Sequence, residues 1–230
     1  MKDYVLFIDT ETTGIPQDFN SPYANDAAWP HSVQVAWVVY TKYGQQVKAE
    51  NHYVRNDGFE ISEGAEKIHG ITSAFLEVHG EDRKFVFELL AADLNKYRPL
   101  VVGHFMELDY HMAGVGFYRS GLDNPMASLP TFCTMQASAS YLIYTHRRSL
   151  RLGELYERLF GKPLEHHHNA LADALATAKC FFQLHRRGDI SDAAIEAQQT
   201  PKPEKKHWYK GGCSLSVLFL LIIIFLSYWL

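Results

Sequence analysis

Residues 4–12 have the sequence YVLFIDTET, a continuous apolar run that ends in two acidic residues. The run YVLFI at 4–8 is rich in β-forming side chains and is typical of a strand buried on both faces of a sheet. Asp9 and Glu11 follow two residues apart, so on an extended chain their side chains point to one face. The stretch therefore predicts a buried strand that carries a pair of carboxylates at its end.

The two carboxylates need a compensating charge. Like charges at the end of a buried strand repel each other and are costly to desolvate. No Lys or Arg lies near Asp9 and Glu11 in the sequence, which makes a divalent cation the natural partner. Ligands that are all oxygen favour Mg²⁺ or Mn²⁺ over zinc. Taken alone, the pair has a competing interpretation as a solvated strand end with two surface acids.

The rest of the chain predicts an α/β domain. Further strands are expected at 33–41, 47–54 and 99–103, with a hairpin turn at Tyr43-Gly44-Gln45. Apolar residues at three- and four-residue spacing predict helices at 81–97, 107–119, 135–144, 149–160 and 169–187. Strands that come first, helices that come later and a helix between the third and fourth strands favour a mixed sheet.

Composition and charge exclude several classes of protein. Of the 230 residues, 47% are hydrophobic and 21% charged, which excludes a wholly disordered chain, a collagen and a coiled coil. Residues 1–200 carry 18 basic and 25 acidic groups, a net charge of −7. A body this acidic is not a general DNA-coating protein, which needs a basic surface. Any contact with nucleic acid must therefore be local, through a metal site or a groove.

The cysteines and the N-terminus favour a reduced, cytosolic setting. Cys133, Cys180 and Cys213 are widely spaced and odd in number, so neither a disulfide framework nor a zinc site is expected. Only a few apolar residues precede Asp9, too few for the apolar region of a signal peptide.

The C-terminal part of the sequence predicts a membrane anchor. Residues 188–212 lose the apolar pattern and are expected to form a linker. The uncharged run 215–230 would be about 24 Å long as a helix, so the anchor is placed at 213–230 to approach the thickness of a bilayer. Four Lys precede it, which predicts a tail-anchored membrane protein with its domain in the cytoplasm. A hydrophobic helix buried in the domain is the alternative.

Four motifs in a fixed order carry a family resemblance. They are Phe7-Ile8-Asp9-Thr10-Glu11-Thr12-Thr13-Gly14, then His69-Gly70-Ile71-Thr72, then Gly103-His104 with Asp109, then His168 with Asp173. Together they resemble the DEDDh, or DnaQ-like, 3′–5′ exonucleases, the family of the proofreading subunit of bacterial DNA polymerase III. The resemblance spans about residues 4–185. One departure is Phe105, where the family usually has Asn.

The resemblance implies a fold, a cofactor and a set of site residues. The fold would be ribonuclease H-like, a mixed sheet flanked by helices, over residues 1–187. Four acids would bind two divalent cations, Mg²⁺ or Mn²⁺, namely Asp9, Glu11, Asp109 and Asp173. His168 would act as general base on a water molecule, since imidazole accepts a proton at neutral pH. Three residues would lie against the terminal nucleotide, namely Thr12, Ile15 and His69.

His168 is one of three adjacent histidines. On a continuous helix, His166 would share a face with Asp173. Asn169 is a good N-cap, however, so the helix should begin after it and leave all three histidines in the preceding loop. The family spacing then selects His168, and His166 and His167 are expected to be exposed loop residues. The basic group 146–148 with Arg151 is either a solvated helix entry or a guide for the strand backbone.

The predicted function is metal-dependent 3′–5′ hydrolysis of phosphodiester bonds at nucleic-acid 3′ ends, preferably single-stranded. A catalytically inactive nucleic-acid-binding module and a polymerase-associated proofreading subunit are the rival functions. The sequence does not separate DNA from RNA as substrate, because a contact to the 2′-hydroxyl cannot be read from it. The predicted partners are nucleic-acid 3′ ends and membrane lipid, and the sequence leaves protein partners open.

Overall fold

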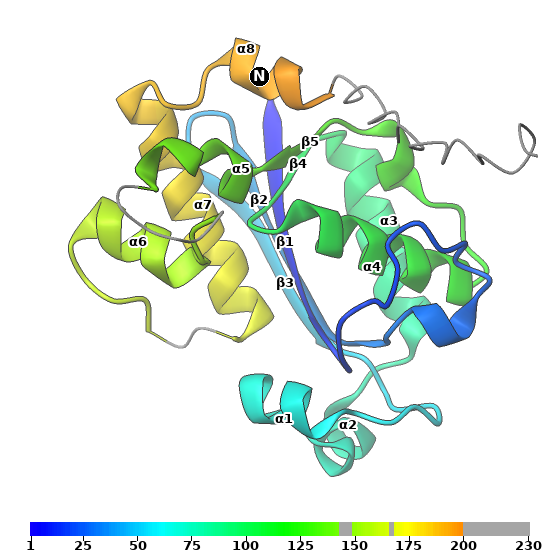
Figure 1. The fold of residues 1–230 in the computed structure, drawn as a ribbon. Coiled ribbons are helices and arrows are strands. Elements are labelled where there is room, and N and C mark those ends of the chain that lie inside the picture. The colour runs from blue at the N-terminus through cyan, green and yellow to red at the C-terminus, as the bar shows by residue number, and fades with distance from the viewer. Residues whose placement is uncertain (143–148, 166–167, 200–230) are drawn as a thin grey trace, which may run out of the picture. The chain divides into compact units, whose positions relative to one another are not determined.

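The strand β1 (Tyr4–Thr12) lies at the centre of a five-stranded sheet in the computed structural model of the protein, which describes residues 1–142, 149–165 and 168–199 (Figure 1). The strand order is β3-β2-β1-β4-β5. On one side of β1, the antiparallel neighbours are β2 (Ser32–Thr41) and β3 (Gln46–Tyr53). On the other side, the parallel neighbours are β4 (Leu100–Gly103) and β5 (Thr131–Cys133). The predicted mixed sheet is confirmed.

Alternation along β1 divides the interior into two cores. Val5 and Phe7 point to one face, where α6 (Leu152–Phe160) and α7 (Ala170–Arg187) cover the sheet. Leu6 and Ile8 point to the other face, where α3 (Arg83–Tyr97) and α4 (Met106–Arg119) pack. All four of these strand residues have no exposed surface. This explains why the run at 4–8 is apolar throughout rather than alternating.

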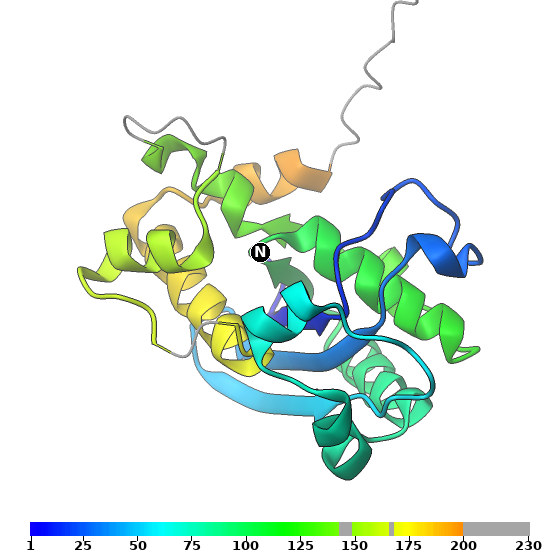
Figure 2. The same ribbon diagram turned by 60° about the horizontal axis from the view of Figure 1, so that its bottom comes forward.

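Two short helices close the end of β1 that carries the acids. They are α1 (Glu63–His69) and α2 (Ser73–His79). The hydroxyl of Ser62 caps α1 by accepting from the backbone N–H of Ala65, and Thr72 caps α2 in the same way. Gly70 ends α1 in the left-handed conformation, with φ of 73°. Figure 2 shows α1 in front of this end of the sheet, near the beginning of α7.

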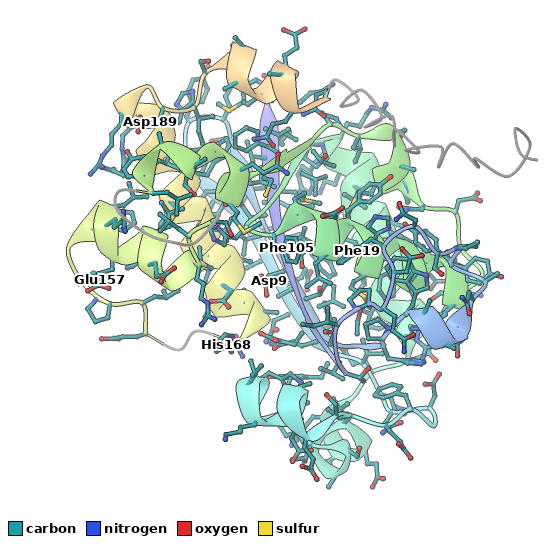
Figure 3. All side chains as sticks on the ribbon, viewed as in Figure 1. Asp9, Phe19, Phe105, Glu157, His168 and Asp189 are labelled. Atoms are coloured by element: carbon teal, nitrogen blue, oxygen red, sulfur yellow. The ribbon has the colours of Figure 1, made fainter. Side chains whose placement is uncertain are left out.

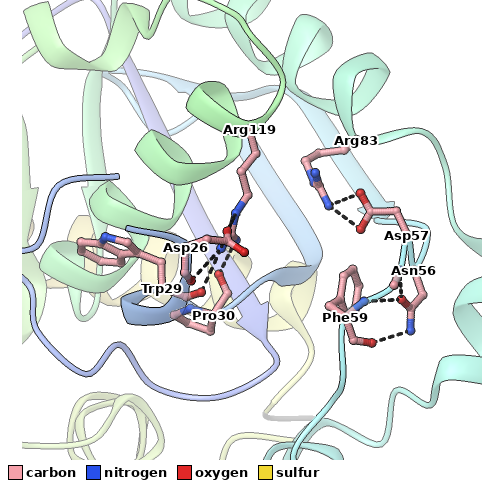
Figure 4. Close-up of polar contacts among 9 residues, drawn as sticks. Asp26, Trp29, Pro30, Asn56, Asp57, Phe59, Arg83 and Arg119 are labelled. Atoms are coloured by element: carbon pink, nitrogen blue, oxygen red, sulfur yellow. Dashed lines mark hydrogen bonds and ion pairs between the residues drawn. The ribbon is translucent and has the colours of Figure 1, made fainter. Parts of the chain in front are cut away.

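The long loop after β1 is held against α4 by one arginine. The Arg119 guanidinium donates to the carboxylate of Asp26 at 2.6 Å and to the carbonyls of Trp29 and Pro30 at 2.9 and 2.7 Å (Figure 4). At the base of the loop, the backbone N–H of Thr13 donates to a carbonyl at 2.8 Å on the residue before β2. The loop that leaves the acidic strand end is therefore tied down at both its base and its far side.

The structure differs from the expected elements in the second half of the chain. Of the helix expected at 135–144, the described residues form only α5 (Thr134–Ala137) followed by a 3₁₀ turn, and residues 143 and 144 lie outside the described residues. The Ser138 hydroxyl donates to the Met135 carbonyl where α5 ends. The expected helix 149–160 begins at Leu152. The linker expected at 188–212 differs in its first part, because it contains α8 (Asp192–Gln199) with Ile195 buried against the domain.

Membrane attachment has no support from the described helices. Within residues 1–142, 149–165 and 168–199, none of the helices combines the length and the apolar character that crossing a bilayer requires. The anchor expected at 213–230 lies outside the described residues.

Candidate active site

Three carboxylates from two elements meet at the end of β1. Asp9 and Glu11 alternate with Thr10 along the strand, so both point toward the face that α7 covers. Asp173 stands in the first turn of α7. One oxygen from each of the three acids lies within 4.8 Å of the others. The pair that the sequence singled out is therefore completed by a third acid that is more than 160 residues away in the chain.

The fourth acid, Asp109, comes from the helix on the opposite face. Its side chain is only 3% exposed, and its Oδ1 accepts a hydrogen bond of 2.9 Å from the Thr10 hydroxyl. Gly103 at the end of β4 makes room for it, because a Cβ at that position would lie 3.0 Å from Asp109 Oδ2. The sequence suggested Gly103 for a tight turn, and the structure adds that its missing side chain lets the carboxylate approach.

Burial raises the pKa values of three acids in this cluster, and the charges of neighbouring carboxylates add to the effect. Burial, followed by the charges of Asp109, Asp173 and Glu11, raises the pKa of Asp9 well above its usual range. Burial and the charge of Asp173 raise the pKa of Glu11 to about 7. Burial also raises the pKa of Asp109 to about 7, against the opposing effect of the Thr10 hydrogen bond.

A divalent cation fits this donor set. Among the described residues, no Lys or Arg forms an ion pair with Asp9, Glu11 or Asp109. The donors are all carboxylate oxygens, which suit Mg²⁺ or Mn²⁺. A cation bound there would favour the ionised acids and reverse the direction of their pKa shifts.

His168 lies beside this cluster, directly before α7. The helix begins after Asn169, whose side chain accepts from the backbone N–H of Ala172, so the predicted N-cap is confirmed. Figure 3 shows His168 at the end of α7 nearer to Asp9. The residue is exposed and has a left-handed backbone conformation, with φ of 65°, and its backbone N–H donates to Asp173 Oδ2 at 3.0 Å. The loop conformation of residue 168 is thus as expected, whereas His166 and His167 lie outside the described residues.

The three predicted nucleotide contacts line one pocket next to the acids. Thr12, Ile15 and His69 surround a cavity of about 450 Å³, and Glu11 forms part of the same wall. Ile15 is 79% exposed, so its side chain is accessible to a molecule in the pocket. The His69 Nδ1 accepts from the Ile71 N–H, which fixes the proton of the neutral ring on Nε2, and burial lowers the pKa of this histidine. The helix α1 supplies the far wall.

Two residues in the predicted motifs have structural roles. His104 is buried, and its ring nitrogens contact the Thr134 hydroxyl and the Leu150 carbonyl, both at 3.0 Å. Phe105 is the residue before α4 and provides no side-chain cap, where an Asn could accept from the backbone. Its ring is 39% exposed and lies 6.1 Å from the ring of Phe19 in the long loop.

Two supporting residues near the acids were not predicted from the sequence. Thr10 holds Asp109, as described above. Gln34 has no exposed surface and lies opposite Glu11 on β2, where its Oε1 accepts from the Ala170 N–H at 3.2 Å. That contact ties the first turn of α7, and with it Asp173, to the sheet. A glutamine inside an otherwise apolar strand was the signal that could have revealed it.

A mixed sheet of this order, flanked by helices on both faces, is a ribonuclease H-like fold. The family model described as Exonuclease, RNase_T, matches residues 6–181. The chain belongs to this exonuclease family, which confirms the DnaQ-like resemblance.

Two curated relatives are far longer than this chain. The PolC-type DNA polymerase III of Lactococcus lactis subsp. lactis (strain IL1403) is 29% identical over 217 residues, which are 89% of this chain and 12% of that protein. The PolC-type enzyme of Lacticaseibacillus paracasei (strain ATCC 334) is 28% identical over 188 residues, 80% of this chain and 11% of that protein. The chain thus spans about an eighth of the length of these relatives.

Solved structures of exonuclease I share the fold. The E. coli enzyme in complex with a dT13 oligonucleotide aligns with a TM-score of 0.66 at 19% identity, over 82% of this chain and 43% of that chain. The complex with a dA16 oligonucleotide gives 0.68 at 19% identity, over 86% and 43%. The chain spans less than half of exonuclease I.

Proposed function

We propose that this protein is a metal-dependent 3′–5′ exonuclease that removes nucleotides from nucleic-acid 3′ ends, with a preference for single strands. The observation that carries the proposal is the position of the acid cluster. Asp9, Glu11 and Asp173 meet at the wall of a pocket of about 450 Å³, and Glu11 belongs to both. A terminal nucleotide held in the pocket would place its phosphate beside the acids. The relatives' names, DNA polymerase III and exonuclease I, support the same class of substrate.

Each residue has a role that follows from its place. Asp9, Glu11, Asp109 and Asp173 would hold two divalent cations, Mg²⁺ or Mn²⁺, which when bound stabilise the negative charge that develops on the phosphate. His168, exposed beside Asp173, would take the proton of the attacking water. Ile15 and His69 would contact the base and sugar of the terminal nucleotide, and Thr12 would position it through its backbone.

The test uses 12-nucleotide single strands of DNA and of RNA labelled at the 5′ end, incubated with the full chain in Mg²⁺ or in EDTA. A 3′–5′ exonuclease shortens the labelled strand one nucleotide at a time, and the better-cleaved polymer identifies the substrate. Asp9→Asn should lower the rate by orders of magnitude while the thermal unfolding transition is kept. The matched control is Asp123→Asn, an exposed acid away from the cluster, which should cleave as the wild type does. Near-normal cleavage by Asp9→Asn in Mg²⁺ would refute the proposal.

The same gel separates the two rival functions. A catalytically inactive binding module would retain the strand without shortening it. A proofreading subunit would prefer a mismatched 3′ end on a primed template, and the PolC relatives favour including that substrate in the test.

Location is a separate proposal that rests on the sequence. The uncharged run within 213–230 and the four Lys before it lead us to propose a tail anchor with the domain on the cytoplasmic side. The full chain should then sediment with membranes at low and high salt and be released by detergent. Recovery entirely in the soluble fraction would exclude a spanning anchor.

A further inference from the structure

A groove with basic and aromatic walls runs along the outer side of α7, away from the acid cluster. It consists of two hollows. The first, of about 300 Å³, lies between the segment after α6 and the first half of α7, and includes Lys162, Leu175 and Lys179. The second, of about 410 Å³, lies between the second half of α7 and the turn joining β2 to β3, and includes Tyr43 and Phe182. Lys179 lines both hollows, so they adjoin at this residue, and together they are called here the α7 groove.

The charge of the α7 groove opposes that of the domain. Lys42, Lys162, Lys179 and Arg186 line it, with Glu165 as its acidic residue. Lys42 pairs with Asp3 at 2.8 Å, whereas Lys162, Lys179 and Arg186 make no ion pair with any described residue. These cations stand on a body whose residues 1–200 carry a net charge of −7. Arg186 donates to the Gln183 amide oxygen at 2.6 Å, a neutral partner that leaves its charge in place. Cations that no described carboxylate neutralises are suited to a polyanion.

The walls of the α7 groove offer flat rings as well. Tyr43 is 86% exposed at the tip of the turn, and the ammonium of Lys42 lies 5.4 Å from its ring centre. Phe182 packs at 5.5 Å against Tyr40, and Phe160 completes this side. Cations along a path with aromatic side chains between them are the usual means of binding single-stranded nucleic acid, because every base can stack on a ring.

The α7 groove and the acid cluster share the helix α7. Asp173 stands in the first turn of α7, and Lys179 and Arg186 follow on the same helix. Figure 3 shows His168 at one end of α7 and Asp189 beyond its other end. From Asp173 to Arg186 the helix rises about 20 Å at ~1.5 Å per residue. This corresponds to about six nucleotides at the ~3.4 Å spacing of a stacked strand.

We propose that the α7 groove binds the single strand on the 5′ side of the nucleotide being removed, so that strands longer than about four nucleotides are held more tightly than shorter ones. The inference rests on the proposed exonuclease function. Lys179 would contact the backbone midway, and Tyr43 would stack on a base at the far end.

The test measures the anisotropy of 5′-fluorescein dT4 and dT12 with the full chain in EDTA, which prevents cleavage. The variant carries Lys42→Ala with Arg186→Ala, because both residues line the far hollow, which dT4 would not reach. The matched control carries Lys84→Ala with Lys96→Ala on α3, across the sheet. For dT12, we expect the first variant to lose tenfold or more in affinity and its logarithmic salt slope to shrink by about 1.4, at ~0.7 per lost phosphate contact. The affinity for dT4 and the control should change by less than twofold.

Two further measurements keep the outcomes distinct. Tyr43→Ala alone should weaken dT12 about fivefold or more, which alanine substitution at a stacking ring predicts, and leave dT4 unchanged. Cleavage of dT4 in Mg²⁺ by the double variant should stay within twofold of the wild type. Failure of the wild type to cleave dT4 in Mg²⁺ would refute the exonuclease function. The binding comparison in EDTA involves no cleavage, so it tests the α7 groove separately. Unchanged dT12 affinity in the Lys42 and Arg186 variant, or an equal loss for dT4, would overturn the proposed strand path along the α7 groove.

Discussion

Asp109 reaches the acid cluster because two neighbouring residues fit around it. Thr10 donates to one of its oxygens at 2.9 Å, and the absent side chain of Gly103 leaves space for the other. Neither feature changes the charge of the site. Both decide where the fourth carboxylate stands, and in a site that must hold cations by carboxylate oxygens the position of each oxygen is decisive.

Gly103→Ala is therefore expected to damage activity more than stability. The new Cβ would lie 3.0 Å from Asp109 Oδ2 and 3.2 Å from the Cα of Met106, so the carboxylate must shift. We expect the cleavage rate in Mg²⁺ to fall tenfold or more, while overpacking costs about 1–3 kcal/mol in the free energy of unfolding. Gly153→Ala is the matched control, because a Cβ there meets no atom within 4 Å. An unchanged cleavage rate would show that activity does not depend on the exact position of the Asp109 carboxylate.

His168→Asn separates the proposed proton acceptor from the backbone around it. Residue 168 has φ of 65°, a conformation that Asn adopts more readily than Ala does, so the backbone bond to Asp173 should survive. We expect the rate between pH 6 and 9 to fall about a hundredfold or more, the usual contribution of a general base, with thermal stability unchanged. The equivalent changes at His166 and His167 should cost only a few-fold. A larger loss at His166 than at His168 would assign the base to His166.

Side chains of the helix α8 form hydrogen bonds to the outer edge of β5, where a further strand would otherwise pair. The Gln198 amide accepts from the Cys133 N–H at 2.8 Å and donates to its carbonyl, and Gln199 bonds both backbone groups of Thr131. These are the groups of β5 that would otherwise form an open edge. The sequence predicted a linker here because 188–199 offers few apolar residues, and glutamine amides leave no periodic signal.

Replacing both glutamines should weaken the domain at this edge. In Gln198→Ala with Gln199→Ala, the backbone groups of Thr131 and Cys133 lose four hydrogen bonds at the edge of the sheet, and each such bond contributes about 0.5–1.5 kcal/mol. Urea unfolding should show a free energy of unfolding lower by at least about 2 kcal/mol, with cleavage of dT4 kept below the transition. Gln136→Ala on α5, an exposed glutamine, is the control. Equal urea midpoints for the double variant and the control would show that the two glutamines of α8 do not stabilise β5.

Across the domain, the elements that could be predicted from the sequence are those with a local pattern of residues. The strands β1, β2 and β4 follow from apolar runs, β3 follows from its place after the hairpin turn at 43–45, and the start of α7 follows from the N-cap Asn169. β5 has only three residues, too few for a recognisable pattern. For the site, the order of the motifs indicated the four acids, but no local pattern encodes the contacts from Thr10 to Asp109 or from Gln34 to α7. Those contacts join segments 99 and 136 residues apart and exist only once the sheet has formed.

The acid cluster should make the stability of the whole domain depend on pH and on metal. Glu11 has its pKa raised to about 7 from 4.5 in the metal-free fold. An acid whose pKa is raised on folding contributes stability below its unfolded pKa, and that contribution is lost as the pH rises toward the folded value. In EDTA, Glu11→Gln should therefore melt close to wild type at pH 5 and several degrees higher than wild type at pH 8.

Divalent metal should reverse this order at pH 8. Mg²⁺ or Mn²⁺ at a hundred times its dissociation constant stabilises a folded protein by about 2.7 kcal/mol. The wild type should therefore gain several degrees at pH 8 and less at pH 5, because the ligands must lose their protons to bind metal. Glu11→Gln should gain little at either pH, and Glu165→Gln, an exposed acid, should behave as wild type. A wild-type melting temperature indifferent to metal at pH 8, or Glu11→Gln melting below wild type in EDTA, would contradict a metal centre at Glu11.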